Sequence, residues 1–407
     1  MDSACGDDLR LSLAEFANDV FAPLRRAVWR ERSEVYVRRI LLGEKRRRRP
    51  FTTRLPQASR DQALNHFVSV SPWDHVPVRR KLTERILTKI TPDAWVLGQT
   101  TFPKCGEMLA GVARQDTGES GRVANCQVGI SAYLASEDAT CPVDWRLFLP
   151  ECWDPTLAKT KAADLLDLRT RTGIPKDARY RPKWQLAVDM LDEMAIWGFR
   201  PPVVVTDRQL DGGDAFASAL ESRGVPYLLE VDPEVTARPE ADPRRRLALR
   251  DIVTGDGPIA PQILGWRQPV KDRDGRLQIT QYRFLFVPVS QPWSDIAQPG
   301  GATPPRWLVV EWPTASREPS GYWLGDLPAD FSLSRLARLT RLQRRVTHDE
   351  RGLVDELGLG RYKGRTWAGW HHHVTLVSAA HAFRVLQRFE PAVPAQLRSR
   401  QPSSALR

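Results

Sequence analysis

The sequence predicts a mixed α/β (α+β) protein in which a helical N-terminal domain precedes a core of strands and helices. Three observations support this fold class. Apolar residues recur at three-to-four spacing through residues 10–90, as on one face of an α-helix. After Pro92 the chain changes to short β-like runs separated by Gly-rich or charged turns. From residue 183 onwards, apolar strand-like runs alternate with helical patterns.

The N-terminal region, residues 1–90, is predicted to contain four helices and to bind DNA. The amphipathic patterns cover residues 9–24, 32–43, 59–70 and 77–90. Between the second and third lies a run of five cations ended by a helix breaker, namely Lys45, Arg46, Arg47, Arg48, Arg49 and then Pro50. Such a run is either a solvated loop or an arm that contacts phosphates, and both interpretations stay open.

The central region, residues 91–232, is predicted to form the first part of an RNase H-like core. Strand-like runs cover residues 94–102, 107–115, 123–136 and 142–150. A helix over residues 183–198, the strand Val-Val-Val-Thr ending at Asp207, another helix and a strand over 226–231 follow. Antiparallel strands followed by helix, strand, helix and strand is the order of that core.

The remaining segments complete the predicted organisation. Residues 233–330 return to strand-and-turn character and are interpreted as an inserted β-rich domain. Residues 331–390 are helical again and would finish the core, with helices over 332–360 and 374–389. The Pro- and Ser-rich residues 391–407 are predicted to be a disordered tail.

Composition narrows the class of protein. A chain of 407 residues exceeds what one core usually serves, and no apolar run approaches the roughly 20 residues of a membrane helix. The acidic start of the chain lacks the pattern of a secretory signal, so we expect a cytoplasmic protein with no membrane partner. The net charge of +11 makes DNA the expected partner, although an Arg-rich chain also results from a GC-rich genome.

Several long segments, in order, resemble one known family. They include FVSVSPWDHVPVRRKL, TGESGRVANCQVGISAYLAS, DWRLFLPECW, YWLGDLPAD and ELGLGRYKGRTWAGWHHHVTLVSAAHAF. The chain resembles DDE transposases of the insertion-sequence-701 group, within the wider insertion-sequence-4 superfamily. The resemblance implies an RNase H-like core interrupted by a β-rich insertion. It also implies DNA as the partner and, in active members, two Mg²⁺ ions held by three carboxylates.

The first of these carboxylates is missing. Family members carry an Asp-Glu-Thr-Gly-Phe-like stretch at the end of the first core strand, where this chain has Gly-Gln-Thr-Thr-Phe. Gly98 therefore stands at the position of the first Asp, and the adjacent acid is the amide Gln99. Because neighbouring side chains of a strand point to opposite faces, Gln99 cannot replace the lost carboxylate.

The second carboxylate is retained, and the third is lost. Asp207 follows its strand directly, as a ligand at a strand end would, while Asp211 and Asp214 nearby are interpreted as turn-forming residues. The family signature Tyr, Arg, Glu and Lys in the late helix falls here on Thr340, Gln343, Thr347 and Val354. Thr347 thus marks the lost third acid, and Glu350 is a weak substitute one turn away on the same helix face.

Two of three ligands are therefore lost, and no metal site or cofactor is expected. The favoured hypothesis is a non-cleaving, DNA-binding pseudo-transposase. The alternative is a repurposed scaffold whose emptied cleft binds a small molecule or performs unrelated chemistry. A third hypothesis is a transposase active through displaced acids. A dimer is plausible, and the oligomeric state stays open.

Candidate DNA contacts and one candidate metal motif complete the set of predicted site residues. Besides the cations of residues 45–49, the expected phosphate contacts are Arg79, Arg80, Lys81, Arg344 and Arg345. The three consecutive histidines His371, His372 and His373 are interpreted as packing and DNA-backbone residues, because adjacent residues of a helix cannot all face one ion.

Overall fold

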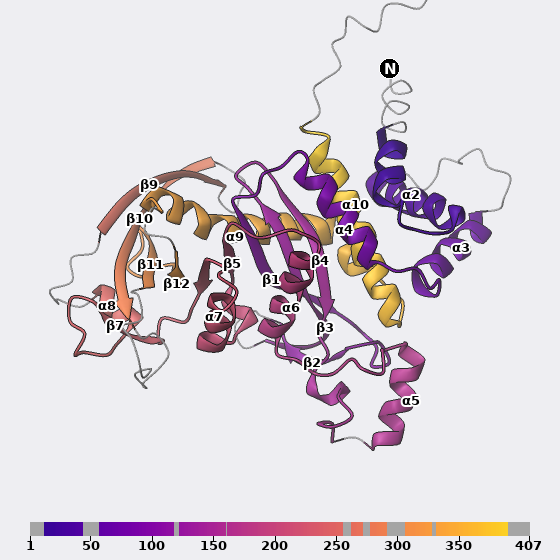
Figure 1. Cartoon of the computed structure of the whole chain (residues 1–407), viewed down its shortest axis with the longest axis horizontal. Coiled ribbons are helices and arrows are strands. Elements are labelled where there is room, and N and C mark those ends of the chain that lie inside the picture. Colours follow the sequence, from indigo (N-terminus) through magenta and orange to yellow (C-terminus); the bar gives the residue numbers. More distant parts are fainter. Residues whose placement is uncertain are drawn as a thin grey trace, which may run out of the picture.

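The computed structural model describes residues 12–43, 57–117, 122–159, 161–254, 262–271, 277–290, 306–327 and 331–389 (Figure 1). The cationic run of residues 45–49 and the tail of residues 391–407 lie outside the described residues. Among the described helices, none is long and apolar enough to cross a lipid bilayer.

The strands of the core lie in the order β4-β3-β1-β5-β6. Their bounds are Ala94–Pro103 for β1, Val123–Ala135 for β3, Thr140–Leu147 for β4, Val204–Thr206 for β5 and Tyr227–Glu230 for β6. β1 pairs antiparallel with β3 and parallel with β5, and β5 pairs parallel with β6. Three antiparallel strands joined to two parallel ones confirm the predicted α/β, RNase H-like core.

The strand predicted over residues 107–115 is mostly a turn. Only Ala113–Asp116 forms a strand, β2, which pairs with the start of β3. Gly111 has a φ of +72°, in the left-handed region, and this backbone conformation cannot belong to an extended strand. The prediction for this segment was therefore wrong in its first two thirds.

The inserted strands continue the same sheet. They are β7 (Thr236–Pro239), β8 (Leu247–Ala248), β9 (Gln262–Lys271), β10 (Leu277–Ser290), β11 (Arg306–Pro313) and β12 (Gly321–Asp326), with the short helix α8 (Leu249–Thr254). β12 pairs antiparallel with β6, so the backbone ladder runs without a break from the core into the insertion. Figure 1 shows β9 to β12 as the outer end of that curved sheet.

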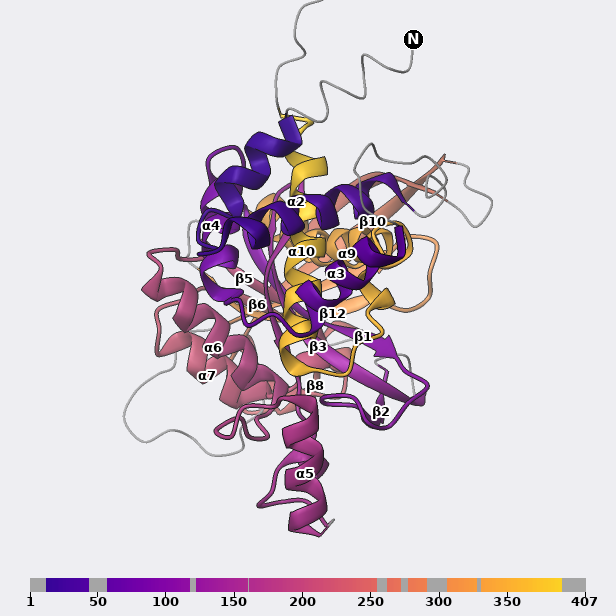
Figure 2. The same cartoon turned by 90° about the vertical axis from the view of Figure 1, so that its right-hand side faces the viewer.

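Helices cover both faces of the core strands (Figures 1 and 2). α6 (Lys183–Ile196) and α7 (Gly213–Glu221) lie on one face, while α9 (Leu333–Asp355) and α10 (Trp367–Leu386) lie on the other. The helix α10 packs so closely on β3 that a Cβ at Gly129 would lie 2.8 Å from the Trp370 ring. Glycine is needed there for that contact.

The N-terminal region is helical, as predicted, and packs against α10. It comprises a helix over residues 12–20, then α2 (Ala27–Leu42), α3 (Gln57–Ser69) and α4 (Val76–Leu87). α10 begins at Trp367, seven residues before its predicted start, because the Thr366 hydroxyl oxygen accepts a hydrogen bond from the Gly369 amide at 3.2 Å and caps the helix. One further helix, α5 (Ala162–Thr172), was not predicted from the sequence and projects from the core (Figure 2).

Candidate functional site

Gly98 and Asp207 lie side by side at the ends of two parallel strands. β1 and β5 pair in register with Leu97 opposite Thr206, which brings the next residue of each strand together. A Cβ built on Gly98 would lie 3.3 Å from Oδ2 of Asp207. The other carboxylate oxygen, Oδ1, accepts a hydrogen bond from the Gln209 amide at 3.0 Å. The carboxylate of Asp207 therefore points to the place where a side chain at position 98 would begin.

Glu350 of α9 reaches the same face of β1. The Thr100 hydroxyl donates a hydrogen bond to the Glu350 carboxylate, and Thr100 is two residues after Gly98, on the same face of the strand. Burial raises the pKa of both acids to about 7; repulsion from Glu230 adds to the rise for Asp207, and repulsion from Asp207 adds to it for Glu350. Asp207 and Glu350 thus form a pair of electrostatically coupled carboxyl groups, called the acid pair below.

Thr347 does not contact β1. Its side chain is exposed, and its hydroxyl donates a hydrogen bond to the Gln343 carbonyl within α9 at 3.1 Å. Thr347 and Glu350 share one side of α9, but it is Glu350 that contacts Thr100. The structure thus brings together Gly98, Asp207 and Glu350 and leaves Thr347 outside this cluster.

The acid pair does not match the donors of a two-metal site. Two Mg²⁺ ions need several hard oxygen ligands at close range in nearly ideal geometry. Here glycine occupies the place next to Asp207, and the described residues include no group of three His, Cys, Asp or Glu side chains arranged to hold a metal ion. Two carboxylates alone leave the ligand set incomplete.

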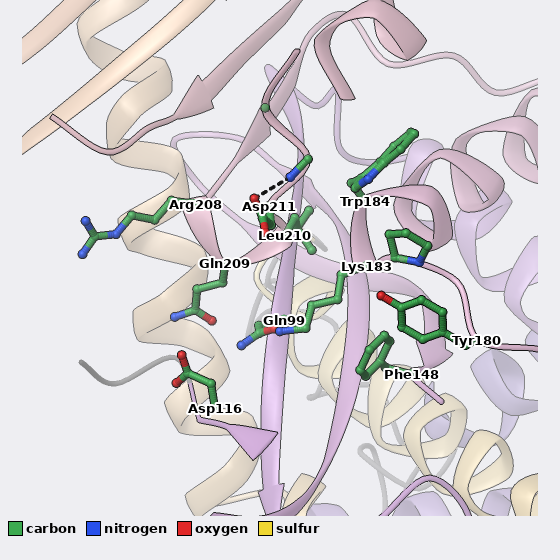
Figure 3. Close-up of a pocket in the computed structure, with 13 residues that line it drawn as sticks. Gln99, Asp116, Phe148, Tyr180, Lys183, Trp184, Arg208, Gln209, Leu210 and Asp211 are labelled. Carbon is green, nitrogen blue, oxygen red and sulfur yellow. Dashed lines mark hydrogen bonds between the residues drawn. The ribbon is translucent and has the colours of Figure 1, made fainter. Parts of the chain in front are cut away.

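A pocket of about 870 Å³ is lined by Gln99, whose side chain points to the face of β1 opposite to that of Gly98 and Thr100. Figure 3 shows this pocket. Its lining includes Gln99, Phe148, Tyr180, Lys183, Trp184 and Arg208. Figure 3 shows the Lys183 side chain extending from α6 towards Gln99. Burial lowers the pKa of Lys183. We call this cavity the Gln99 pocket.

The expectation that Arg79 contacts DNA is corrected by its burial. Its side chain is 1% exposed, and its guanidinium donates to the Asp144 carboxylate at 2.8 Å and to the Trp145 carbonyl at 2.6 Å. A further hydrogen bond joins it to the Thr375 hydroxyl of α10 at 2.8 Å. Arg79 ties α4 to β4 and α10, and no phosphate can reach it in this conformation.

The other predicted cations of the described residues are at the surface and have protein partners. Arg80 and Lys81 both pair with Glu84, at 3.1 and 3.5 Å. Arg344 pairs with the buried Glu311 at 2.5 Å, and Arg345 donates to the Asp138 carbonyl at 2.8 Å. Arg80 is the most exposed of these four, at 53%, whereas Lys81, Arg344 and Arg345 are held in part by contacts within the fold.

The three histidines are buried in α10. The two ring nitrogens of His372 lie 2.8 Å from the carbonyl oxygens of Val68 and Trp73, and the neutral ring donates to one of them; Nε2 of His373 lies 3.1 Å from the Gly358 carbonyl oxygen. Burial lowers the pKa of each to about 4. His371 lies against Arg79, and burial also lowers its pKa. The structure therefore supports the packing interpretation, and these buried side chains do not reach a DNA backbone.

Asp211 and Asp214 occupy a turn and the start of α7. Asp211 has a φ of +57°, and its Oδ1 accepts a hydrogen bond from the Gly212 amide at 2.7 Å. Asp214 lies in the first turn of α7, where an acid is favourable. Asp211 agrees with the turn-forming interpretation, whereas Asp214 belongs to the helix α7.

Sequence reasoning did not identify the Gln99 pocket. Its lining comes from β1, from the segment after β4, from α6 and from the turn after β5, which are far apart in the sequence. The available signal was the cluster Tyr180, Lys183 and Trp184 before and within α6, but an aromatic and cationic cluster at a helix start is also common on ordinary surfaces. The sequence does not show that Gln99 lies next to this cluster, because the two are brought together only by the packing of α6 on the sheet.

Comparison with known proteins assigns most of the chain to one family. The family described as DDE superfamily endonuclease matches residues 19–283. A curated relative, the "Probable transposase for insertion sequence element IS701" of Microchaete diplosiphon, is 24% identical over 190 residues. That alignment covers 46% of this chain and 45% of the relative, so the chain matches less than half of the relative's length.

Proposed function

The chain belongs to the DDE superfamily of endonucleases, and from that premise we propose that it is a non-cleaving, DNA-binding pseudo-transposase. One observation carries the proposal. The place beside Asp207 that a first carboxylate would fill is taken by Gly98, whose Cβ position is 3.3 Å from Oδ2 of Asp207. Without that ligand, the acid pair is short of the donors for a two-metal clamp. Phosphodiester cleavage by the family's chemistry is then not expected.

DNA binding is supported by charge and by family. The net charge of +11 gives a cationic molecule that releases counterions when it binds phosphates. The surface cation Arg80 lies on α4, and the helical N-terminal region also carries Arg30, Arg32 and Arg39 on α2. The curated relative is described as a transposase, a class of protein that acts on DNA.

A salt titration tests DNA binding. In a gel-shift series with duplex DNA, log affinity should fall linearly with log salt concentration, with a slope of about −0.9 per neutralised phosphate. Arg80→Ala should reduce that slope by about 1 if Arg80 contacts a phosphate. Absence of binding at low salt, or an affinity that does not change with salt, would contradict the proposal.

A cleavage assay tests the loss of catalysis. Supercoiled DNA that includes the sequences flanking the gene would be incubated with the protein and either Mg²⁺ or Mn²⁺. We expect no nicking above that of the Asp207→Asn variant. Metal-dependent nicking that disappears in both Asp207→Asn and Glu350→Gln would instead support a transposase active through displaced acids, which is favoured only by the contact of Glu350 with the same face of β1.

A repurposed scaffold is the second candidate function. The observation that favours it is the Gln99 pocket, whose volume of about 870 Å³ suits a small molecule. Genomic context separates the candidates, because terminal inverted repeats indicate a mobile element and a biosynthetic operon indicates reuse.

A further inference from the structure

The floor of the Gln99 pocket holds a polar group without a partner. The Gln99 side chain is 9% exposed, and its Oε1 accepts no hydrogen bond within the part of the chain that the structure describes. A buried acceptor without a hydrogen-bond donor destabilises the folded state by about 1–3 kcal/mol. Because Gln99 lines the pocket, a ligand that carries an N–H or O–H donor would remove this cost.

One end of the pocket is aromatic. The rings of Phe148 and Tyr180 lie 6.0 Å apart at 69°, and the Lys183 ammonium is 5.7 Å from the centroid of the Phe148 ring. Trp184 lies at the same end (Figure 3) and packs on Gly212, whose φ of +104° and close approach to the indole require glycine. Such a surface suits a flat ring that stacks on aromatic side chains.

The other end attracts anions. Arg208 extends away from the aromatic residues in Figure 3, and its side chain is 56% exposed. The N-terminus of α7 lies at the aromatic end instead, because Gly212 packs on Trp184, and the Gly212 amide donates to Oδ1 of Asp211 at 2.7 Å. Arg208 is 3.9 Å from Asp232, a surface pair that is too weak to prevent binding to a phosphate.

Acids also face the pocket, and they restrict the ligand. Asp116 and Asp211 contribute carboxylates to the lining, so a ligand with negative charge only would be repelled along part of it. The ligand must combine a flat ring, hydrogen-bond donors on that ring and an anionic group at some distance. A simple anion lacks the ring, and an apolar compound leaves Gln99 and Lys183 unsatisfied.

We propose that the Gln99 pocket binds a single nucleotide, with the base stacked near Phe148 and Tyr180 and the phosphate directed to Arg208. An amino or imino group of the base donates to Oε1 of Gln99, and Lys183 donates to an acceptor on the base edge or the sugar. The same chemistry is present in a free mononucleotide and in an unpaired nucleotide at the end of a DNA strand.

Calorimetric titration distinguishes the two sources. One arm uses each of the four deoxynucleoside 5′-monophosphates without DNA, and the other compares a blunt duplex with the same duplex carrying one unpaired nucleotide. Saturable binding of a mononucleotide assigns the pocket to free nucleotides, and tighter binding of the overhang duplex assigns it to strand ends. Either result supports the proposal. Binding of the blunt duplex tests the proposed DNA-binding function separately, because it needs no pocket.

Variants place the binding in the pocket. Gln99→Leu and Lys183→Met should each weaken nucleotide binding about tenfold, and Tyr180→Ala at the rim about as much through lost stacking. Gln185→Leu is the matched control, because Gln185 is on the same helix but lines a different groove. If Gln99→Leu fails to fold, the Tyr180→Ala variant still shows whether the nucleotide binds in the Gln99 pocket. The proposal is overturned if neither nucleotide source binds, or if Tyr180→Ala and Lys183→Met bind as well as Gln185→Leu does.

Discussion

At the scale of single residues, protonation reduces the repulsion between the two carboxyl groups of the acid pair. Asp207 at the end of β5 and Glu350 on α9 are enclosed close to each other, and each has a pKa of about 7. In a metalloenzyme a divalent cation would offset such repulsion. Here Lys183 lowers the pKa of Asp207 from the opposite face of β1, and Arg351 lowers the pKa of Glu350, but burial outweighs both. The two carboxyl groups therefore remain partly protonated near neutral pH.

The acid pair makes stability depend on pH. In the unfolded chain both carboxyls have a pKa of about 4, whereas in the folded protein both values are about 7. The folded state therefore binds more protons than the unfolded state between about pH 4 and about pH 7. The free energy of unfolding is highest below about pH 4 and falls as the pH rises from there through 7. The loss is up to about 1.4 kcal/mol per pH unit for each carboxyl. Chemical denaturation at about pH 5 and about pH 8 measures the free energy of unfolding at each pH. Its decrease between the two pH values should be smaller in Asp207→Asn and in Glu350→Gln than in the wild type.

A surface acid provides the control for this pH dependence. Asp192 pairs with Arg223, whose hydrogen bond lowers the pKa of Asp192, so its contribution to stability is lost only at acidic pH. In Asp192→Asn, the free energy of unfolding should change between about pH 5 and about pH 8 as much as it does in the wild type. Equal slopes in the wild type and in Asp207→Asn would show that the acid pair is not protonated as described.

Introducing a carboxylate at position 98 should create a metal site. Gly98→Asp would place a third acid against Asp207, and the 3.3 Å approach of the Cβ requires a shift of only a few tenths of an ångström. Because Mn²⁺ binds carboxylate oxygens, free Mn²⁺ should stabilise this variant by about 2–3 kcal/mol at roughly a hundredfold excess over its Kd. Thermal unfolding with and without Mn²⁺ measures the effect. Gly98→Asn, of the same shape without the charge, should respond as weakly as the wild type; a wild-type response equal to that of Gly98→Asp would contradict the incomplete ligand set.

At the scale of elements, α4 is held by a buried ion pair that binds it to two other elements. Arg79 and Asp144 are 1% and 0% exposed, and Arg146 also bonds to Oδ1 of Asp144, at 2.9 Å. A buried pair contributes little net free energy when intact, but removing one partner leaves an uncompensated charge. The position of α4 against β4 and α10 thus depends on one side chain.

Loss of the Arg79 guanidinium should destabilise the protein strongly. Arg79→Met leaves Asp144 buried with Arg146 as its remaining partner, and the free energy of unfolding should fall by about 3–5 kcal/mol. Arg80→Met, one position along α4 and exposed, should change it by less than about 0.5 kcal/mol. Denaturant titration of both variants gives the comparison. A loss of less than about 1 kcal/mol for Arg79→Met would contradict the dependence of α4 on this buried ion pair.

The elements themselves were largely predictable from the sequence. β1, β5 and β6 are apolar runs bounded by turn residues, and their parallel neighbours follow from the helices between them. The burial of Arg79 was not predictable, because its partner Asp144 is 65 residues away and its neighbours Arg80 and Lys81 are surface cations. For Glu350, the periodicity of α9 gives a shared face with Thr347, but which of the two reaches β1 depends on how α9 packs.

At the scale of the whole molecule, the insertion and the core share one sheet. β12 pairs with β6 through Trp323 opposite Glu230 to Asp326 opposite Tyr227. The same edge strand of the core carries Glu230, which acts on the pKa of Asp207. A change in the position of β12 can therefore move Glu230 on β6 and alter the pKa of Asp207. Because backbone ladders transmit strain between neighbouring strands, we expect the core and the insertion to unfold together.

A substitution at the junction should uncouple the two parts. At Gly325 of β12 a Cβ would lie 2.7 Å from the Tyr227 carbonyl of β6, so Gly325→Val should break the β6–β12 pairing. Calorimetry should show one transition for the wild type, with equal calorimetric and van't Hoff enthalpies, and two transitions for Gly325→Val. Gly265→Val is the matched control, because a Cβ at Gly265 of β9 meets nothing within 4 Å, and it should keep a single transition. Two transitions in the wild type would show that the continuous sheet does not couple the core to the insertion, and a single transition in Gly325→Val would show that contacts other than the β6–β12 pairing carry the coupling.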